Sequence, residues 1–155
     1  PSQSELIKQA SHDNLIEIAN HGLTHCVVGK NLSKLFTSNR KYHREFWDWI
    51  PREIHFEHLE KSQDIFRQWL GNTPTTFIPP GNVYSVDTLE AAEKHGIKRI
   101  NSYMILNVES TVHIIKNDNI KAFHDRDLVL EGVEWLKNKL ASNGENVNYC
   151  FIRDL

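Results

Sequence analysis

Short apolar segments alternate along the chain with longer segments in which apolar residues recur every three or four positions. The short segments predict strands at 15–19, 75–78, 97–103, 111–115, 120–123 and 147–152. The longer segments predict helices at 44–70, 85–95 and 127–142. Gly71 and Gly96 follow two of these helices, as is typical of a helix end. Strands that alternate with helices indicate an α/β fold built on a parallel sheet.

Three of the predicted strands are followed directly by residues that can carry chemistry. They are the two histidines at 21 and 25, the turn at 80–82 and the His-Asp pair at 124–125. In parallel α/β folds the ends of the strands lie on one face, where active sites form. We therefore expect these three segments to meet on one face of the sheet.

His21 and His25 are four residues apart, a spacing that can turn two imidazole rings toward one divalent metal ion. Zinc is held by three or four protein ligands, so the pair would be half of a site. A third ligand from within this chain would have to be Cys26, Glu45 or Asp125, and the sequence favours none of them. The alternative is a turn with one buried and one exposed histidine.

The turn formed by Pro80, Gly81 and Asn82 follows the second predicted strand. Pro80 has no N–H group, but Gly81 and Asn82 do, and glycine allows a ligand to approach the backbone closely. Such N–H groups can stabilise a developing oxyanion. The alternative is a plain turn between a strand and a helix.

His124 comes at the end of the strand predicted at 120–123, with Asp125 directly after it. Histidine is the side chain best suited to transfer a proton near neutral pH, so these two residues are catalytic candidates. The alternative is a helix-capping turn, in which Asp125 or Asp127 caps the following helix and His124 has no chemical role.

These segments, in this order, resemble the polysaccharide deacetylases, which are carbohydrate esterase family 4 and share the NodB homology domain. EIANHGLTH resembles the family's metal-binding His-x-x-x-His motif, and FIPPGNVYSVDTLEAAEKHGIK resembles the segment around its Arg-x-Pro motif. AFHDRDL resembles the last motif, which carries the catalytic histidine, and NYCFIRDL resembles the closing strand. The similarity covers most of the chain.

The resemblance implies a metal-dependent deacetylase that acts on N- or O-acetylated carbohydrate. His21 and His25 would be ligands of a divalent metal, with zinc the first candidate, and metal-activated water would attack the amide or ester. Backbone N–H groups of residues 80–82 would hold the oxyanion, and His124 would act as the general acid.

The sequence also departs from the family's pattern. It contains no Asp-Asp pair, the motif in which the family has its general base and its third metal ligand. Ile78 stands where the family has the arginine of Arg-x-Pro, and Asn101 lies roughly where it has the aspartate that tunes the catalytic histidine. These departures support the alternative of a catalytically inactive carbohydrate-binding or scaffolding module of the same fold.

The missing motif and the length lead to an expectation about the fold. We expect residues 1–155 to form a single domain that is the C-terminal portion of a larger catalytic domain: a partial (β/α) barrel of the NodB type, missing its first strands. With 39% hydrophobic residues the chain can bury one core. Absent strands would leave open sheet edges, which predicts a homo-oligomer that covers them.

Charge and hydropathy exclude some partners. The formal net charge of −2 argues against a nucleic-acid footprint, which would be basic. The apolar runs are far shorter than a membrane span. The partner that the resemblance implies is an acetylated carbohydrate, and the two cysteines do not indicate a compartment.

Two further segments could bear on function. The segment 43–49 carries three aromatic residues, and we expect an amphipathic turn that buries Phe46 and Trp49, the alternative being a loop that contacts glycan. His55 and His58 are a second close pair, three apart on a predicted helix, and we expect them on its solvated face.

Overall fold

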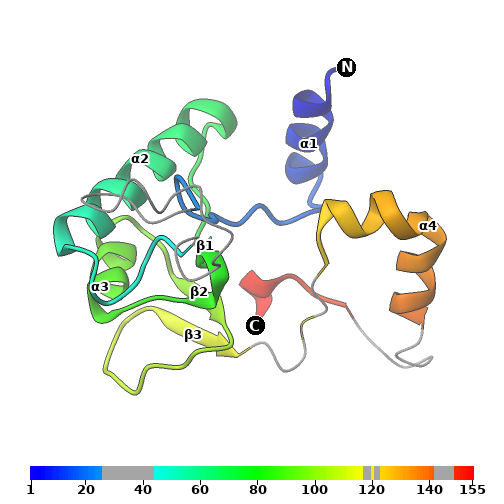
Figure 1. Cartoon of the computed structure of the whole chain (residues 1–155). Coiled ribbons are helices and arrows are strands. Elements are labelled where there is room, and N and C mark those ends of the chain that lie inside the picture. The colour runs from blue at the N-terminus through cyan, green and yellow to red at the C-terminus, as the bar shows by residue number, and fades with distance from the viewer. Residues whose placement is uncertain (26–43, 117–119, 121–122, 142–148) are drawn as a thin grey trace, which may run out of the picture. The chain divides into compact units, whose positions relative to one another are not determined.

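The computed structural model describes residues 1–25, 44–116, 120, 123–141 and 149–155. These contain the helices α1 (Gln3–His12), α2 (Arg52–Leu70), α3 (Val86–Lys94) and α4 (Asp125–Ala141), the strands β1 (Thr76–Phe77), β2 (Arg99–Ser102) and β3 (His113–Lys116), and the short 3₁₀ helices η3 (Pro80–Asn82) and η5 (Ile152–Asp154) (Figure 1). The chain forms two compact units, one of Pro1–Asn117 with Phe151–Leu155 and one of Asp118–Cys150.

The first unit is built on a three-stranded parallel sheet in the order β1-β2-β3. Thr76 pairs with Arg99, and Ile100 pairs with Ile114. Helix α3 connects β1 to β2 and packs against α2, as a parallel pair of strands requires a crossover connection (Figure 1). The predicted α/β class with a parallel sheet is therefore confirmed.

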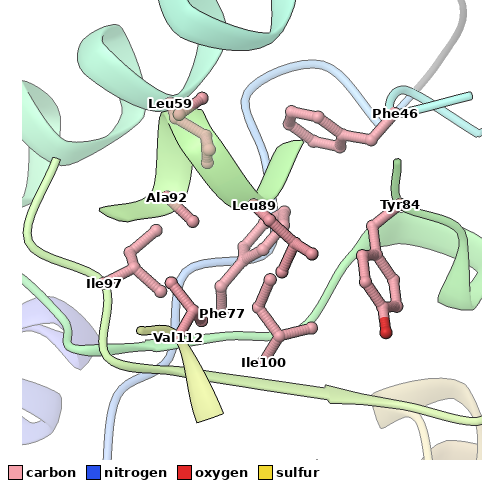
Figure 2. Close-up of a cluster of buried hydrophobic side chains, with 10 residues drawn as sticks. Phe46, Leu59, Phe77, Tyr84, Leu89, Ala92, Ile97, Ile100 and Val112 are labelled. Carbon is pink, nitrogen blue, oxygen red and sulfur yellow. The ribbon is translucent and has the colours of Figure 1, made fainter. Parts of the chain in front are cut away.

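The core of this unit lies between the sheet and the two helices. Phe77 and Ile100, on neighbouring strands, are completely buried, and the ring of Phe46 meets Phe77 edge-on with centroids 5.2 Å apart. The same cluster includes Leu59, Tyr84, Leu89, Ala91, Ala92, Ile97 and Val112 (Figure 2). Removing this much apolar surface from water is the main stabilising contribution.

Two helix boundaries follow from their sequence signals. Helix α2 ends at Gly71, whose φ of 80° is left-handed and suits a residue without a Cβ atom. Helix α3 begins after Ser85, whose hydroxyl accepts the N–H of Thr88 while the Thr88 hydroxyl accepts the N–H of Ser85. Both boundaries confirm the sequence prediction.

Two predicted strands are wrong where the structure describes them. Residues 15–19 form no strand, and only Asn20 makes an isolated bridge, to Phe77. A strand forms only where a neighbouring strand is long enough to pair with it. Because β1 has only two residues, the chain before Asn20 has no strand residues to pair with. Ile152 belongs to η5 and residues 149–151 are not extended into a sheet. Residues 147–148 of the second of these predicted strands lie outside the described residues, as do residues 121–122 of the strand predicted at 120–123.

The second unit contains α4, which begins two residues before the predicted start. Gly132 leaves the helical conformation, with φ 78° and ψ 170°, and interrupts the element. Val129 and Val133, which are four residues apart, are 84% and 62% exposed. Gly132, a residue without a Cβ atom, interrupts the helix between these two positions. No helix in the described ranges is both long and apolar enough to span a membrane.

Candidate functional site

Asn20 fixes the start of the loop that carries the two histidines. Its backbone N–H donates to the carbonyl of Thr76 at 2.9 Å, and its carbonyl accepts the N–H of Ile78 at 2.8 Å. Its fully buried side chain donates to the hydroxyl of Ser62 at 2.8 Å and accepts the N–H of Gly22 at 2.8 Å. The loop is therefore tied at its base to β1 and to α2.

His21 and His25 lie side by side, as predicted. Their ring centroids are 5.0 Å apart and the rings are tilted by 60°. Nδ1 of His21 is 2.5 Å from the carbonyl oxygen of Ile78, so Nδ1 carries the hydrogen of this bond and Nε2 would be the atom that binds a metal. Both side chains are exposed, so the alternative of one buried and one exposed histidine is wrong.

Glu45 comes from a distant segment and holds the backbone of this loop. Its carboxylate is completely buried and accepts the N–H groups of Leu23 at 3.0 Å, Thr24 at 3.1 Å and His25 at 2.9 Å. Its other close partner is Nδ1 of His58, 2.5 Å away. Both oxygens are thus used within the protein, which is a different role from that of a third metal ligand.

The charge of Glu45 follows from the same contacts. Burial raises the pKa of the carboxyl group, but the hydrogen bonds from His58 and from the backbone of Leu23 and His25 lower it by more, so the pKa lies below its usual value. Glu45 is therefore ionised at neutral pH, and each hydrogen bond to it is charge-assisted.

The expectation that His55 and His58 lie on a solvated face is wrong. His55 is completely buried and His58 is 6% exposed. The two share the inner face of α2 with Leu59 and Ser62, which lie about one and two turns after His55. The helical spacing of Leu59 and Ser62 could have placed both histidines on the buried face. Their hydrogen-bond partners, Thr88 and Glu45, are remote in sequence and could not be predicted from that spacing.

His55 predicts a dependence of stability on pH. Its Nδ1 is 2.9 Å from the hydroxyl of Thr88, its ring packs edge-on against Phe46, and burial lowers its pKa below the usual value. Because the folded pKa is lower than the unfolded one, the stabilisation is present above about pH 6.5 and is lost as the pH falls through that value. Urea unfolding at pH 7.5 and pH 5.5 measures the loss.

The matched variant for this measurement is His55→Asn, which keeps a polar atom toward Thr88 and does not titrate. We expect the loss of stability between the two pH values to be smaller in His55→Asn than in the wild type. His12→Asn, on the exposed helix α1, should behave like the wild type. Equal losses in all three proteins would contradict the prediction.

The structure brings residues 80–82 next to the two-histidine loop. A Cβ atom at Gly22 would lie 3.1 Å from Cγ of Pro80, and the hydroxyl of Ser102 donates to the carbonyl of Asn82 at 2.9 Å, which fixes the turn to the end of β2. Gly81 has φ 65°, and a Cβ atom there would lie 2.6 Å from the side chain of Arg44. The turn therefore needs glycine at position 81.

The predicted oxyanion donors have different surroundings. The N–H of Asn82 donates to the carbonyl of Pro79 at 2.9 Å, a bond that closes the 3₁₀ turn. Use of this N–H toward an oxyanion would require that bond to be given up, whereas the Gly81 N–H is not needed to close the turn. The role of Pro80, Gly81 and Asn82 stays a prediction.

His124 and Asp125 belong to the second unit. The N–H of His124 donates to the carboxylate of Asp127 at 2.8 Å, and the N–H of Asp127 donates to the carbonyl of His124 at 2.9 Å, so these residues cap α4. The bond from the His124 N–H lowers the pKa of Asp127. The catalytic role of His124 and Asp125, and their meeting with the first unit, stay predictions.

At the two positions that depart from the family pattern, the structure shows one backbone contact and one side-chain contact. The carbonyl of Ile78 receives the hydrogen bond from His21. The side-chain amide of Asn101 is buried and donates to the carbonyl of Ile115 at 3.1 Å, bracing β2 against β3. Both positions support the sheet and the loop, and neither supplies a charge.

The donor set fits two ligands of a divalent metal. The pair has the second hydrogen bond that metal-binding histidines usually make, here from His21 to a backbone carbonyl. Among the residues that the structure describes, no group of three or more His, Cys, Asp or Glu side chains could hold a metal. Of the candidate third ligands, Cys26 lies outside the described residues and Asp125 is in the second unit. The carboxylate of Glu45 is occupied by hydrogen bonds from the loop backbone and from His58.

Segment 43–49 partly follows its prediction. Phe46 is completely buried, as expected, but Trp49 is 49% exposed. Arg44 lies over the ring of Trp47, 5.3 Å from its centroid. Position 43 lies outside the described residues.

Residues 1–100 match the family model described as polysaccharide deacetylase. The chain belongs to the polysaccharide deacetylase family. The resemblance seen in the motifs is thereby confirmed, and the matched region contains the two-histidine loop, Glu45 and the turn at 80–82. His124 lies beyond it.

Solved structures show what this chain is similar to in fold. A de-N-acetylase from Aggregatibacter actinomycetemcomitans superimposes with a TM-score of 0.51 at 15% identity, over 79% of this chain and 50% of that one. The BpsB deacetylase domain from Bordetella bronchiseptica gives a TM-score of 0.49 at 15% identity, over 74% of this chain and 49% of that one. The chain thus spans about half the length of these structures. No curated protein matches the sequence.

Proposed function

We propose that this chain carries the metal-binding histidines of a deacetylase that acts on N- or O-acetylated carbohydrate. The observation that supports this most directly is the paired arrangement of His21 and His25, with Nδ1 of His21 held by the carbonyl of Ile78, in a chain of the polysaccharide deacetylase family. That hydrogen bond fixes the tautomer in which Nε2 can be a ligand.

Each predicted residue has a role in this proposal. His21 and His25 hold a divalent metal, with zinc the first candidate, which when bound polarises the acetyl carbonyl as a Lewis acid and makes water a better nucleophile. Backbone N–H groups of the turn at 80–82 stabilise the negative charge on the carbonyl oxygen. His124, beside Asp125, donates the proton that the leaving amine or alcohol needs.

The proposal has requirements that these residues do not meet alone. The pair needs at least one more ligand, and hydrolysis needs a base, yet the chain contains no Asp-Asp pair. We propose that the described α/β sheet is part of a (β/α) barrel of the NodB type, and that residues 1–155 act as one domain within it. A homo-oligomer that covers open sheet edges belongs to the same proposal.

The test is a calorimetric titration with zinc of this chain, of His21→Ala and of the control His12→Ala, whose histidine is exposed on α1. We expect one-to-one binding by the wild type and the control, and binding weaker by more than about 100-fold in His21→Ala, since loss of a mere supporting group already costs 10–100-fold.

Two outcomes would contradict the proposal. Equal zinc affinity in His21→Ala and the wild type would remove His21 from the site. Absence of binding by the wild type would favour the alternative, a catalytically inactive carbohydrate-binding or scaffolding module of the same fold, which a direct binding measurement with the same oligosaccharide would detect.

A further inference from the structure

Glu45 is a buried carboxylate that serves a loop to which it does not belong. Three consecutive N–H groups, those of Leu23, Thr24 and His25, point at its two oxygens, and all of these bonds are 2.9 to 3.1 Å long. Consecutive N–H groups converge on one anion only when the backbone curls around it, so the carboxylate determines the curvature of the loop.

Gly22 shows how closely the loop encloses this anion. A Cβ atom at position 22 would lie 2.5 Å from Oε2 of Glu45, well inside contact distance, and the residue has φ 86°. His25, at the other end of the three N–H groups, is also left-handed, with φ 55°. This conformation is uncommon for a residue with a Cβ atom, and the bond from the N–H of His25 to Glu45 helps to hold it.

His58 holds the carboxylate in place from the opposite side. Its Nδ1 is 2.5 Å from Oε1 of Glu45, and α2, on which it lies, is anchored to the core by Leu59. A carboxylate without compensation would be costly to bury, and here the three N–H groups and His58 compensate it. Helix α2 therefore holds Glu45 through the side chain of His58, and Glu45 in turn holds the two-histidine loop.

We propose that Glu45, fixed by His58, is the positioning residue that sets the relative placement of the His21 and His25 rings. This rests on the proposed function of the two histidines as metal ligands. Their functional atoms need to be held within about 0.5 Å, which a loop of five residues achieves only with a supporting set of hydrogen bonds. Asn20 fixes the beginning of the loop, and Glu45 fixes its end.

The first experiment compares the wild type with Glu45→Gln in the absence of metal. The amide of glutamine keeps the shape but loses the charge and one acceptor. We expect hydrogen exchange at the N–H groups of Leu23, Thr24 and His25 to be faster by about 10–100-fold, as for loss of charge-assisted bonds. We also expect the nuclear Overhauser contacts between the rings of His21 and His25 to disappear.

The matched control is Glu57→Gln, the same substitution at an exposed position of α2 that is paired with Lys61. It should leave both measurements unchanged. Exchange at Ile100, on the central strand β2, reports in every variant whether the core has stayed folded. Unchanged exchange in the loop, or ring contacts that persist in Glu45→Gln, would overturn the proposal.

A second pair of variants tests the support from α2. His58→Leu removes the donor to Glu45, and His58→Asn keeps a donor near the position of Nδ1. We expect His58→Leu to speed exchange in the loop and His58→Asn to restore most of the protection. If Glu45→Gln fails to fold, the comparison of His58→Leu with His58→Asn tests the proposal in its place. Equal rates of loop hydrogen exchange in these two variants would overturn the proposal.

Zinc affinity separates this inference from the proposed function. We expect Glu45→Gln to bind zinc 10–100-fold more weakly than the wild type and Glu57→Gln, as is typical for loss of a group that orients a ligand. Unchanged affinity in Glu45→Gln would overturn the positioning role. If the wild type binds no zinc while the ring contacts still depend on Glu45, the proposed function fails and the positioning role stands.

Discussion

Replacement of Phe77 by alanine is expected to lower the free energy of unfolding by about 3–5 kcal/mol. Phe77 is completely buried on β1, and its ring meets that of Phe46 edge-on. The substitution removes a large apolar surface and leaves a cavity that the packed neighbours fill only in part. Urea unfolding followed by tryptophan fluorescence measures the change.

The control for this prediction is Tyr103→Ala, which removes an aromatic ring that is 62% exposed in the same unit. It should change the free energy of unfolding by no more than about 0.5 kcal/mol. A comparable loss in both variants would mean that the cluster around Phe77 is not the core. Because the backbone of Phe77 bridges to Asn20, the core variant should also loosen the start of the two-histidine loop.

Gly22→Ala is expected to destabilise the protein by about 2–5 kcal/mol, of which 1–2 arise from the left-handed backbone and 1–3 from overpacking. The added methyl group would lie 2.5 Å from Oε2 of Glu45 and 3.1 Å from Cγ of Pro80. The carboxylate is completely buried and hydrogen-bonded, so it has little room to move. Thermal and urea unfolding measure the effect.

Gly71→Ala separates the two causes. Gly71 has φ 80°, close to the 86° of Gly22, but a Cβ atom there would meet nothing within 4 Å. It should therefore lose only the backbone part, about 1–2 kcal/mol. If the two variants lost the same stability, contact with Glu45 would contribute nothing, and the enclosure of the carboxylate by the loop would be in doubt.

Local signals in the sequence predicted local structure well. Ser85 and Gly71 mark helix ends because capping and left-handed backbone depend on one or two neighbouring residues. The strand at Thr76–Phe77 was found in the same way, since β-branched and aromatic residues favour it. Residues 15–19 are equally apolar but form no strand, because β1 is too short to pair with them. The length of the neighbouring strand cannot be read from the composition of residues 15–19.

The proximity of the two candidate ligands was predicted from the sequence, whereas the residues that support their loop were missed. The spacing of His21 and His25 brought them together as expected, because four residues suffice to place both on one loop. Glu45 was visible only as a carboxylate twenty residues away, and His58 only as a histidine on a helix. Their roles depend on contacts between segments remote in sequence, which neither periodicity nor spacing reports.

The bond from the N–H of His25 to Glu45 has a consequence for chain length. It brings together two residues that are twenty apart in the sequence, so Glu45 acts on the two-histidine loop through space and not along the chain. In general, each doubling of the number of residues between two contacting positions costs only about 0.6 kcal/mol in closure entropy. We therefore expect the contact between His25 and Glu45 to tolerate changes in the number of residues that separate them along the chain.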